Sequence, residues 1–247
     1  MTKYECMRWA TFPIMPTHLV TVRNDLKKML KSIKKSTQNI SILDVGGRKS
    51  PYTINLPVEV TILDVPQESG AREELNLGFT DNILSTIQKK RSNIKDVIIQ
   101  DMTKSTLPDA AYDAVVCVEV IEHVEEDDVF VKNISKVVRK GGWAYFTTPN
   151  GDYIKNEGPD KNPDHIRHYT RNELQALLEK HFDKAEVRYA VKTGKYRVWG
   201  LKSFKKSNPL AIFKSITGNF VNRIQSIGVE NTSIRTAHLV AIGYNYE

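Results

Sequence analysis

Residues 40–50 read ISILDVGGRKS, and this stretch decides the fold class. The β-branched run 40–45 ends at two glycines, as a buried strand does where the chain turns toward the next element. Because the run is almost continuously apolar, it is typical of a strand that is covered on both faces of a parallel sheet. The stretch therefore predicts the first strand of an α/β domain.

Similar runs recur along the chain with room for a helix between them. They are VEVTILDV at 58–65, IKDVIIQ at 94–100, YDAVVCV at 112–118 and WAYFTT at 143–148. Helical periods occupy residues 18–36, 79–90, 127–139 and 171–181, and two late strands are expected at 185–191 and 237–244. This pattern predicts an α/β fold, a doubly wound Rossmann-like sheet of about seven strands, mostly parallel with an antiparallel last strand.

The length of 247 residues fits one large domain. We expect an N-terminal segment with a covering helix at 1–37 and a main domain at 38–247, with a basic insertion at about 195–232. No apolar run reaches the roughly 20 residues that cross a bilayer, and no secretory signal opens the chain. Two cysteines cannot form a disulfide framework. We therefore expect a cytoplasmic protein without a transmembrane segment.

The net charge of +7 is unevenly distributed. Residues 187–229 contain no Asp or Glu, but they contain the following basic residues: Arg188, Lys192, Lys195, Arg197, Lys202, Lys205, Lys206, Lys214 and Arg223. Aromatic residues alternate with these charges, which suits a nucleic acid, an anionic lipid surface or a phosphorylated substrate. The alternative is a solvated face whose aromatic rings turn toward the core.

Polar residues and glycines follow the predicted strands. They are Asp44, Gly46, Gly47, Asp64, Asp101, Met102 and Glu119. Ligands of doubly wound sheets bind at the carboxyl ends of the strands, so these residues are the candidate cofactor-binding set. Asp64 follows Asp44 by about 20 residues, where an acidic side chain accepts hydrogen bonds from ribose hydroxyls. A simple turn at Gly46-Gly47 is the structural alternative.

Four segments together resemble the class I S-adenosylmethionine-dependent methyltransferases over roughly residues 38–190. They are ILDVGG, VTILDV, IIQDMTKSTLPDAAYDAVVCVEVIEHV and VVRKGGWAYFTTPN. The resemblance implies S-adenosylmethionine as cofactor, with Gly46 beside its methionine part, Asp64 at the ribose, and Asp101 with the Met102 backbone at the adenine. Arg48 and Lys49 replace the small residues that are usual in the family, and either can hold the cofactor carboxylate.

A second candidate set is Glu119, Glu122 and His123. On a helix the spacing i, i+3, i+4 places these side chains on one face. Two carboxylates and an imidazole suit Mg²⁺ or Mn²⁺, and the polar loop 159–170, with His165 and His168, can supply a fourth ligand. The alternative is that Glu122 and His123 cap a helix or pair with basic neighbours.

This set is similar to that of the small-RNA 3′-terminal 2′-O-methyltransferases. There an E-x-x-E-H segment and a later D-H-x-x-x-aromatic-T segment, matched here by residues 164–170, hold a metal. Similar E-x-x-E-H segments occur in ubiquinone-type and sugar-modifying O-methyltransferases. The resemblance therefore implies methyl transfer to oxygen.

We predict O-methylation of a hydroxylated small molecule or sugar, with His123, His165 or His168 as general base where no metal serves. Methylation of an RNA ribose 2′-hydroxyl is the alternative substrate. A non-catalytic cofactor-binding or scaffold subunit is the alternative outside enzymes. We expect His18 and His181 to lie at helix ends and His238 in a strand, without a chemical role.

Overall fold

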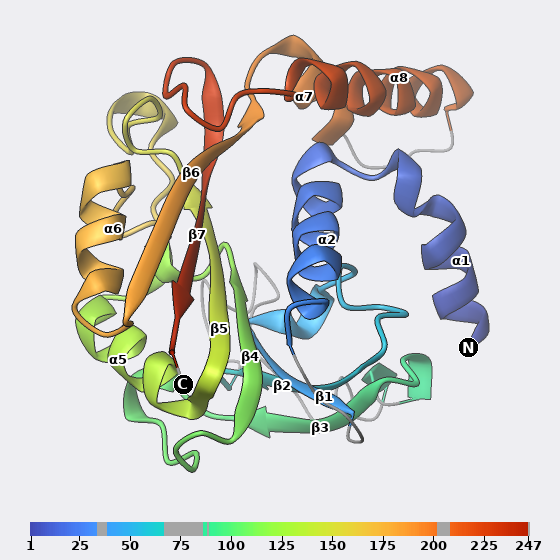
Figure 1. The fold of residues 1–247 in the computed structure, drawn as a ribbon. Helices are drawn as coiled ribbons and strands as arrows, with labels where there is room; N and C mark the ends of the chain where they lie inside the picture. Colours follow the sequence, from blue (N-terminus) through green and yellow to red (C-terminus); the bar gives the residue numbers. More distant parts are fainter. Residues whose placement is uncertain (34–38, 67–85, 88, 202–207, 247) are drawn as a thin grey trace.

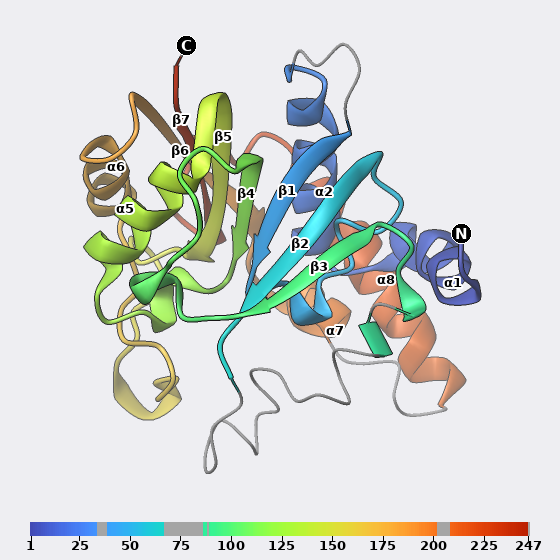
Figure 2. The ribbon, with the colours of Figure 1, turned by 90° about the horizontal axis from the view of Figure 1, so that it is seen from below.

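The computed structural model describes residues 1–33, 39–66, 86, 87, 89–201 and 208–246, and a seven-stranded sheet forms its middle layer (Figures 1 and 2). The strand order is β3-β2-β1-β4-β5-β7-β6. The strands are β1 (Ile40–Val45), β2 (Val58–Asp64), β3 (Ile94–Ile99), β4 (Tyr112–Val118), β5 (Val138–Pro149), β6 (Lys184–Lys192) and β7 (Thr236–Tyr244). The first five are parallel, and β7 is antiparallel to both β5 and β6. This confirms the predicted sheet.

Helices cover both faces of the sheet. Those of the described residues are α1 (Lys3–Thr11), α2 (Thr17–Leu30), α5 (Asp127–Val137), α6 (Arg171–Glu179), α7 (Lys195–Leu201) and α8 (Pro209–Gln225). Figure 2 shows α5 and α6 on one side of the sheet and α2 on the other. The segment between β6 and β7 carries α7 and α8, which lie above the end of α2 (Figure 1). None of the described helices is long and apolar enough to span a bilayer.

Alternate residues of the central strands enter different cores. In β4, Val115 and Cys117 pack with the helices α5 and α6, whereas Ala114 and Val116 pack with α2. Leu26 of α2 is completely buried in the second core. Burying such a side chain contributes roughly 1.5–3 kcal/mol. Two dry cores therefore fix the sheet and leave its carboxyl edge for polar residues.

Several short 3₁₀-helices occur among the described residues, one between α1 and α2 and the others after strands. They are η1 (Phe12–Ile14), η2 (Gly47–Lys49), η3 (Met102–Lys104), η4 (Ile121–His123) and η5 (Gly158–Asp160). The helix expected from Glu119 to His123 was therefore wrong, because only η4 forms there. Glu119 itself has φ +56, a left-handed conformation that no α-helix contains.

Other element boundaries differ from the predicted ones. The first covering helix ends at Leu30 rather than at residue 36. The fifth strand begins at Val138, because the chain continues through Gly141 with φ +73 and a register shift opposite Tyr112. The helix predicted at 79–90 lies largely outside the described residues.

Candidate active site

A cavity of about 400 Å³ lies at the carboxyl ends of the parallel strands. Gly46 after β1, Asp64 at the end of β2, Asp101 and Met102 after β3, and His123 after β4 all line it. Asp101 uses one carboxylate oxygen to accept hydrogen bonds from the backbone and hydroxyl of Thr103, each at 2.8 Å. The cavity is thus lined by residues that the sequence places at the carboxyl ends of the strands.

Gly46 keeps this cavity open. Its φ of +70 is left-handed, and a Cβ there would lie 2.5 Å from Cγ2 of Val120, which also lines the cavity. The backbone N–H of Gly46 donates to the carbonyl of Leu63 at 2.8 Å and ties the β1 loop to β2. The close approach and the conformation both require glycine. Gly46 therefore forms a cradle that any side chain would fill.

Asp44 and Gly47 support the cavity from below. Asp44 is fully buried, and its carboxylate accepts hydrogen bonds from the hydroxyls of Ser50, Tyr52 and Thr53 at 2.5, 3.1 and 3.3 Å. A Cβ at Gly47 would lie 2.2 Å from this carboxyl group. Burial raises the pKa of Asp44, whereas these donors and the charge of Arg91 lower it. Neither residue lines the cavity, so both act on the loop conformation.

Arg48 is buried close to Asp64. Burial lowers the pKa of the guanidinium, and the negative charge of Asp64 raises it. The side chain of Lys49 lies outside the described part of the structure. A cation therefore stands beside the acidic residue at the end of β2.

His123, which lines the cavity, also forms a cluster with Glu122 and His165. One possible ligand atom from each lies within 4.8 Å of the others. Glu122 is completely buried, and its carboxylate oxygens form no well-aligned hydrogen bond among the described residues, although the nearby Thr148 hydroxyl partly offsets the rise in its pKa. Burial and the negative charge of Glu119 raise its pKa well above the usual range. An unpartnered buried carboxylate is costly unless a cation or a proton satisfies it.

Hydrogen bonds fix which nitrogen of each imidazole faces this carboxylate. His123 Nδ1 lies 2.7 Å from the carbonyl of Asp164, and His168 Nδ1 lies 2.7 Å from that of Ile154. A carbonyl only accepts, so both Nδ1 atoms donate, and in a neutral His168 Nε2 accepts from His165 Nδ1 at 2.7 Å. The Nε2 lone pairs of neutral His123 and His165 are therefore left free. This arrangement orients two imidazoles as ligands or bases.

His165 is neutral at physiological pH. Burial and the neighbouring imidazoles of His123 and His168 lower its pKa to about 4. The rings of His123 and His165 meet edge to face at 4.7 Å. The imidazole of His165 is thus available as an electron-pair donor near pH 7.

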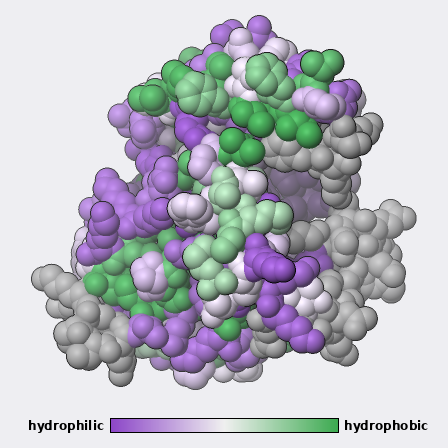
Figure 3. Space-filling model, turned by 90° about the vertical axis from the view of Figure 1, so that its right-hand side faces the viewer, coloured by the Kyte–Doolittle hydropathy of each residue, from purple (hydrophilic) through white to green (hydrophobic). Residues whose placement is uncertain are grey.

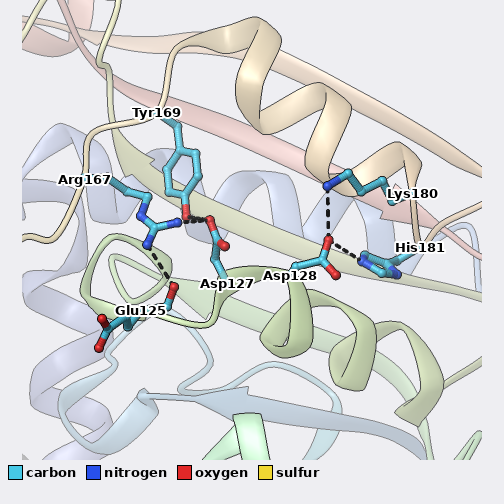
Figure 4. A network of polar contacts seen from close by, with 7 residues as sticks. All are labelled: Glu125, Asp127, Asp128, Arg167, Tyr169, Lys180 and His181. Carbon is cyan, nitrogen blue, oxygen red and sulfur yellow. Dashed lines mark hydrogen bonds and ion pairs between the residues drawn. The ribbon is translucent and has the colours of Figure 1, made fainter.

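A network of polar contacts holds the histidine loop against α5 (Figure 4). Asp127 accepts hydrogen bonds from Arg167 at 2.5 Å and from the hydroxyl of Tyr169 at 2.6 Å. Arg167 also donates to the carbonyl of Glu125, and the backbone N–H of Ile166 donates to the carbonyl of Glu122 at 2.8 Å. These bonds fix the loop that carries His165 and His168.

A neighbouring part of the same network uses His181. Its Nε2 lies 3.2 Å from Oδ1 of Asp128, which Lys180 also contacts at 3.2 Å (Figure 4). The His181 and Lys180 hydrogen bonds lower the pKa of Asp128. His181 therefore connects the end of α6 to the start of α5.

Glu119 turns away from the Glu122 cluster toward other histidines. Its Oε1 lies 3.2 Å from His238 Nδ1 and 3.9 Å from His18 Nε2, and the two imidazoles stack at 4.2 Å. Thr147 donates to the same oxygen at 2.8 Å. Arg197 lies 3.2 Å from His238 Nε2, and because guanidinium only donates, Nδ1 of His238 carries the proton that faces Glu119.

The charges of this second cluster are settled by its surroundings. Burial opposes ionisation of Glu119, but the neighbouring imidazoles and the Thr147 hydroxyl lower its pKa overall. Burial and the neighbouring His238 lower the pKa of His18 to about 3. Glu119 is therefore an anion and His18 is neutral near pH 7.

A second cavity of about 310 Å³ opens beside these groups. His18, Glu119, Arg197 and His238 line it together with apolar residues of α2, β6 and α7. Nε2 of His18 is buried without a hydrogen-bond partner in the described structure. The negative charge of Glu119 acts on both clusters. It raises the pKa of Glu122 in the first cluster and of His18 in the second.

Residues 21–181 match the model of a protein family described as "Methyltransferase domain". The chain belongs to this family. It is similar to the ubiquinone biosynthesis O-methyltransferase of Rickettsia conorii, with 30% identity over 138 residues that cover 54% of this chain and 42% of that protein. The corresponding protein of Rickettsia bellii is 26% identical over 171 residues, covering 63% and 66%. The chain spans less than two thirds of the length of these relatives.

Solved structures show the same fold. An S-adenosylmethionine-dependent methyltransferase of Thermotoga maritima has a TM-score of 0.57 at 13% identity, covering 97% of this chain and 94% of that chain. The phosphoethanolamine N-methyltransferase 2 of Haemonchus contortus, in complex with S-adenosyl-L-methionine, has a TM-score of 0.55 at 12% identity, covering 91% and 53%. The predicted class I S-adenosylmethionine-dependent methyltransferase is confirmed at the level of the family, and S-adenosylmethionine is the cofactor of such enzymes.

In this methyltransferase the residues that were predicted to form one site lie in different parts of the structure. Asp44 and Gly47 do not line the cavity at the strand ends, and Glu119 lines the second cavity rather than joining Glu122, His123 and His165. The motifs gave no sign of His18, Arg197 and His238, because these residues come from three distant segments. The acid-free stretch around Arg197 was the one available signal.

Proposed function

We propose that this protein transfers a methyl group from S-adenosylmethionine to an oxygen of a hydroxylated small molecule or sugar. The observation that carries the proposal is the cavity at the carboxyl ends of four parallel strands, with His123 of the imidazole cluster in its wall. The names of the Rickettsia relatives favour oxygen as the accepting atom.

The cofactor fits the residues that are present. Gly46 provides the open cradle for its methionine part, Asp64 accepts hydrogen bonds from its ribose, and Asp101 with the Met102 backbone holds its adenine. Arg48 is close enough to Asp64 to contribute a positive charge in the same region. When bound, the cofactor supplies an electrophilic methyl group. The chain needs only to align the acceptor oxygen and to remove its proton.

Where no metal is bound, proton removal falls to His123 or His165, whose Nε2 lone pairs are then free. His168 is a positioning residue, since both of its ring nitrogens are used in holding His165 and the Ile154 carbonyl. A neutral imidazole of this kind accepts a proton from a hydroxyl as the oxygen reacts. The bound proton remains at Nε2 until solvent removes it.

A divalent ion fits the same cluster. Glu122, His123 and His165 would hold Mg²⁺ or Mn²⁺, because the ion would satisfy the buried carboxylate and both lone pairs. It would supply a Lewis acid that stabilises a developing alkoxide. Glu119 is not part of this ligand set in the structure.

We place the body of the acceptor in the second cavity. The negative charge of Glu119 and the positive charge of Arg197 balance there, and His18 is neutral, which favours an uncharged hydroxylated acceptor. RNA is the second candidate acceptor, favoured by the basic residues between 187 and 229.

Isothermal titration with S-adenosylmethionine and its demethylated product, with and without Mn²⁺, tests the proposal. We expect micromolar binding of both compounds, and Mn²⁺ binding that Glu122→Gln abolishes and the exposed control Glu179→Gln retains. Absence of cofactor binding would reject the proposed methyltransferase activity and favour the alternative of a non-catalytic scaffold subunit. Cofactor binding without Mn²⁺ binding would reject the metal and retain His123 and His165 as bases. RNA as acceptor predicts binding that falls steeply with salt.

A further inference from the structure

Helix α8 buries its polar residues and exposes its large apolar ones. The buried residues are Ser215, Gly218, Asn219 and Asn222. In contrast, Leu210 is 78%, Phe213 70% and Phe220 63% exposed. An ordinary surface helix of a soluble domain has the opposite arrangement, with its apolar stripe against the core. The exposed stripe of α8 therefore needs an explanation outside the core.

The inward face of α8 is held by hydrogen bonds to backbone carbonyls. Asn219 donates to Ile14 at 2.9 Å and to Gly200 at 3.2 Å, and Asn222 donates to Lys192 at 2.6 Å. These bonds use the polar side chains of the helix and fix its orientation. The apolar residues consequently point outward because of the fold, and no rotation of the helix can bury them without breaking the bonds.

The outward residues form a narrow stripe. Successive helical residues turn by about 100°, which places Leu210, Phe213, Phe220 and Ile224 within an arc of about 80°. Ile227, just beyond the helix, is also 78% exposed. Figure 3 shows the corresponding apolar side chains gathered along the top of the molecule, where Figure 1 places α8. Contiguous exposed apolar surface of this kind marks an interaction site.

The charge around this stripe selects the partner. The segment 187–229, which contains α7 and α8, has nine basic residues and no acidic one. Of the basic residues that the structure describes there, Arg188 pairs with Asp25, and Arg197 and Arg223 contact His238 and backbone carbonyls. Lys195 and Lys214 are the exposed ones among them. Lys214 is exposed on α8 beside Phe213, with its ammonium group 4.3 Å from the ring centroid of Trp199. Basic side chains flanking bulky apolar ones are typical of helices that lie in the interface of an anionic membrane.

Other partners fit less well. A second copy of the chain bound through the same face would bring two basic segments together, and like charges repel. RNA would engage the cations and could stack on the two phenylalanines, but it would leave the aliphatic residues Leu210 and Ile224 in water.

We propose that α8 docks this protein on an anionic membrane surface, with Leu210, Phe213, Phe220 and Ile224 inserted among the acyl chains and lysines at the lipid phosphates. None of the residues that line the cavity at the ends of the parallel strands belongs to α8, so docking through this helix leaves that cavity accessible. The proposal of membrane docking does not depend on which molecule accepts the methyl group.

Flotation of the full chain with vesicles of phosphatidylcholine, alone or with phosphatidylglycerol, tests the proposal. We expect at least tenfold stronger partitioning onto the vesicles that contain phosphatidylglycerol. The double variant Phe213→Ser/Phe220→Ser should reduce partitioning at least tenfold, and Lys214→Gln about fivefold. Val129→Ser, an exposed apolar residue of α5, is the control that should change nothing.

Cofactor affinity and the circular dichroism spectrum check that the variants remain folded. Equal binding to both vesicle types, no binding, or unchanged binding of the double variant would overturn the proposal. Two further outcomes would replace it with another partner. A dimer in light scattering that the double variant dissolves would indicate a second copy, and RNA binding without vesicle binding would indicate a nucleic acid.

Discussion

Replacing Gly46 by alanine tests how the β1 loop keeps the cofactor cavity open. The backbone of Gly46 is left-handed at φ +70, which costs a residue with a side chain roughly 1–2 kcal/mol. The new Cβ would also lie 2.5 Å from Cγ2 of Val120, and overpacking of this kind costs about 1–3 kcal/mol. We therefore expect Gly46→Ala to lower the free energy of unfolding by about 2–5 kcal/mol.

Gly228 offers a matched control. Its φ of +77 is almost the same, but no atom lies within 4 Å of the position its Cβ would occupy. Gly228→Ala should therefore cost only the conformational part, about 1–2 kcal/mol. The difference between the two variants measures the contact with Val120. Removing Cγ2 in the double variant Gly46→Ala/Val120→Ala should recover about 1–3 kcal/mol as a coupling energy.

The assay is urea denaturation followed by circular dichroism, with the free energy of unfolding obtained by linear extrapolation. Isothermal titration with S-adenosylmethionine gives the second readout. Val120 lines the cavity that its displacement would narrow, so cofactor affinity should fall at least tenfold in Gly46→Ala and remain unchanged in Gly228→Ala. Equal losses of stability in both single variants, or no recovery in the double variant, would refute the steric argument.

Three further substitutions probe the surroundings of the cavity. Asp44→Asn removes the charge that compensates buried Arg91, so urea denaturation should show a loss of about 3 kcal/mol, while titration should show cofactor affinity within threefold of wild type. Asp127→Asn weakens the clamp formed by Arg167, so Mn²⁺ affinity measured by titration should fall about tenfold. His18 has a pKa of about 3 when folded and 6.5 when unfolded, so the unfolded state binds the extra proton. Between pH 6 and 5 the wild type should lose about 1.2 kcal/mol more stability than His18→Asn in urea denaturation.

Specific outcomes would contradict each of these expectations. A loss of cofactor binding in Asp44→Asn without a loss of stability would indicate that Asp44 contacts the cofactor, as the sequence predicts. Unchanged Mn²⁺ affinity in Asp127→Asn would separate the clamp from the cluster. Parallel stability curves of wild type and His18→Asn would show that burial does not keep His18 neutral.

Much of the fold could be predicted because the apolar sequence of each central strand by itself indicates a strand that is buried on both faces. In β4 every residue from Ala114 to Cys117 is apolar, and the structure buries all four between two helical layers. The first and last residues of the strands and helices were less predictable where the backbone conformation of single residues determines them. Gly141-Gly142 predicts a turn, but the chain passes through a left-handed residue inside β5, and the pairing with β4 moves from Val138 opposite Tyr112 to Trp143 opposite Ala114.

The cofactor cavity was also predictable in part, since parallel strands bring their carboxyl ends to one edge. This geometry suffices to gather Gly46, Asp64 and Asp101, whatever their side chains do. It does not distinguish a residue that faces the cavity from one that holds the loop. Asp44 precedes Gly46 by only two residues, yet its carboxylate points into the buried cluster of hydroxyls.

The histidine clusters show why spacing alone could not predict the rest. The E-x-x-E-H spacing predicts a shared face only if the backbone is helical from its first residue. At Glu119 the chain is left-handed, a conformation that costs a residue with a side chain roughly 1–3 kcal/mol. The backbone N–H of Glu119 donates to Thr147 of β5, and its carboxylate binds the same residue and His238. These contacts offset the strain and send the carboxylate away from Glu122. One residue of the motif therefore serves each cavity, and the assignment depends on His18 and His238, which lie more than 100 positions apart from Glu119 in sequence.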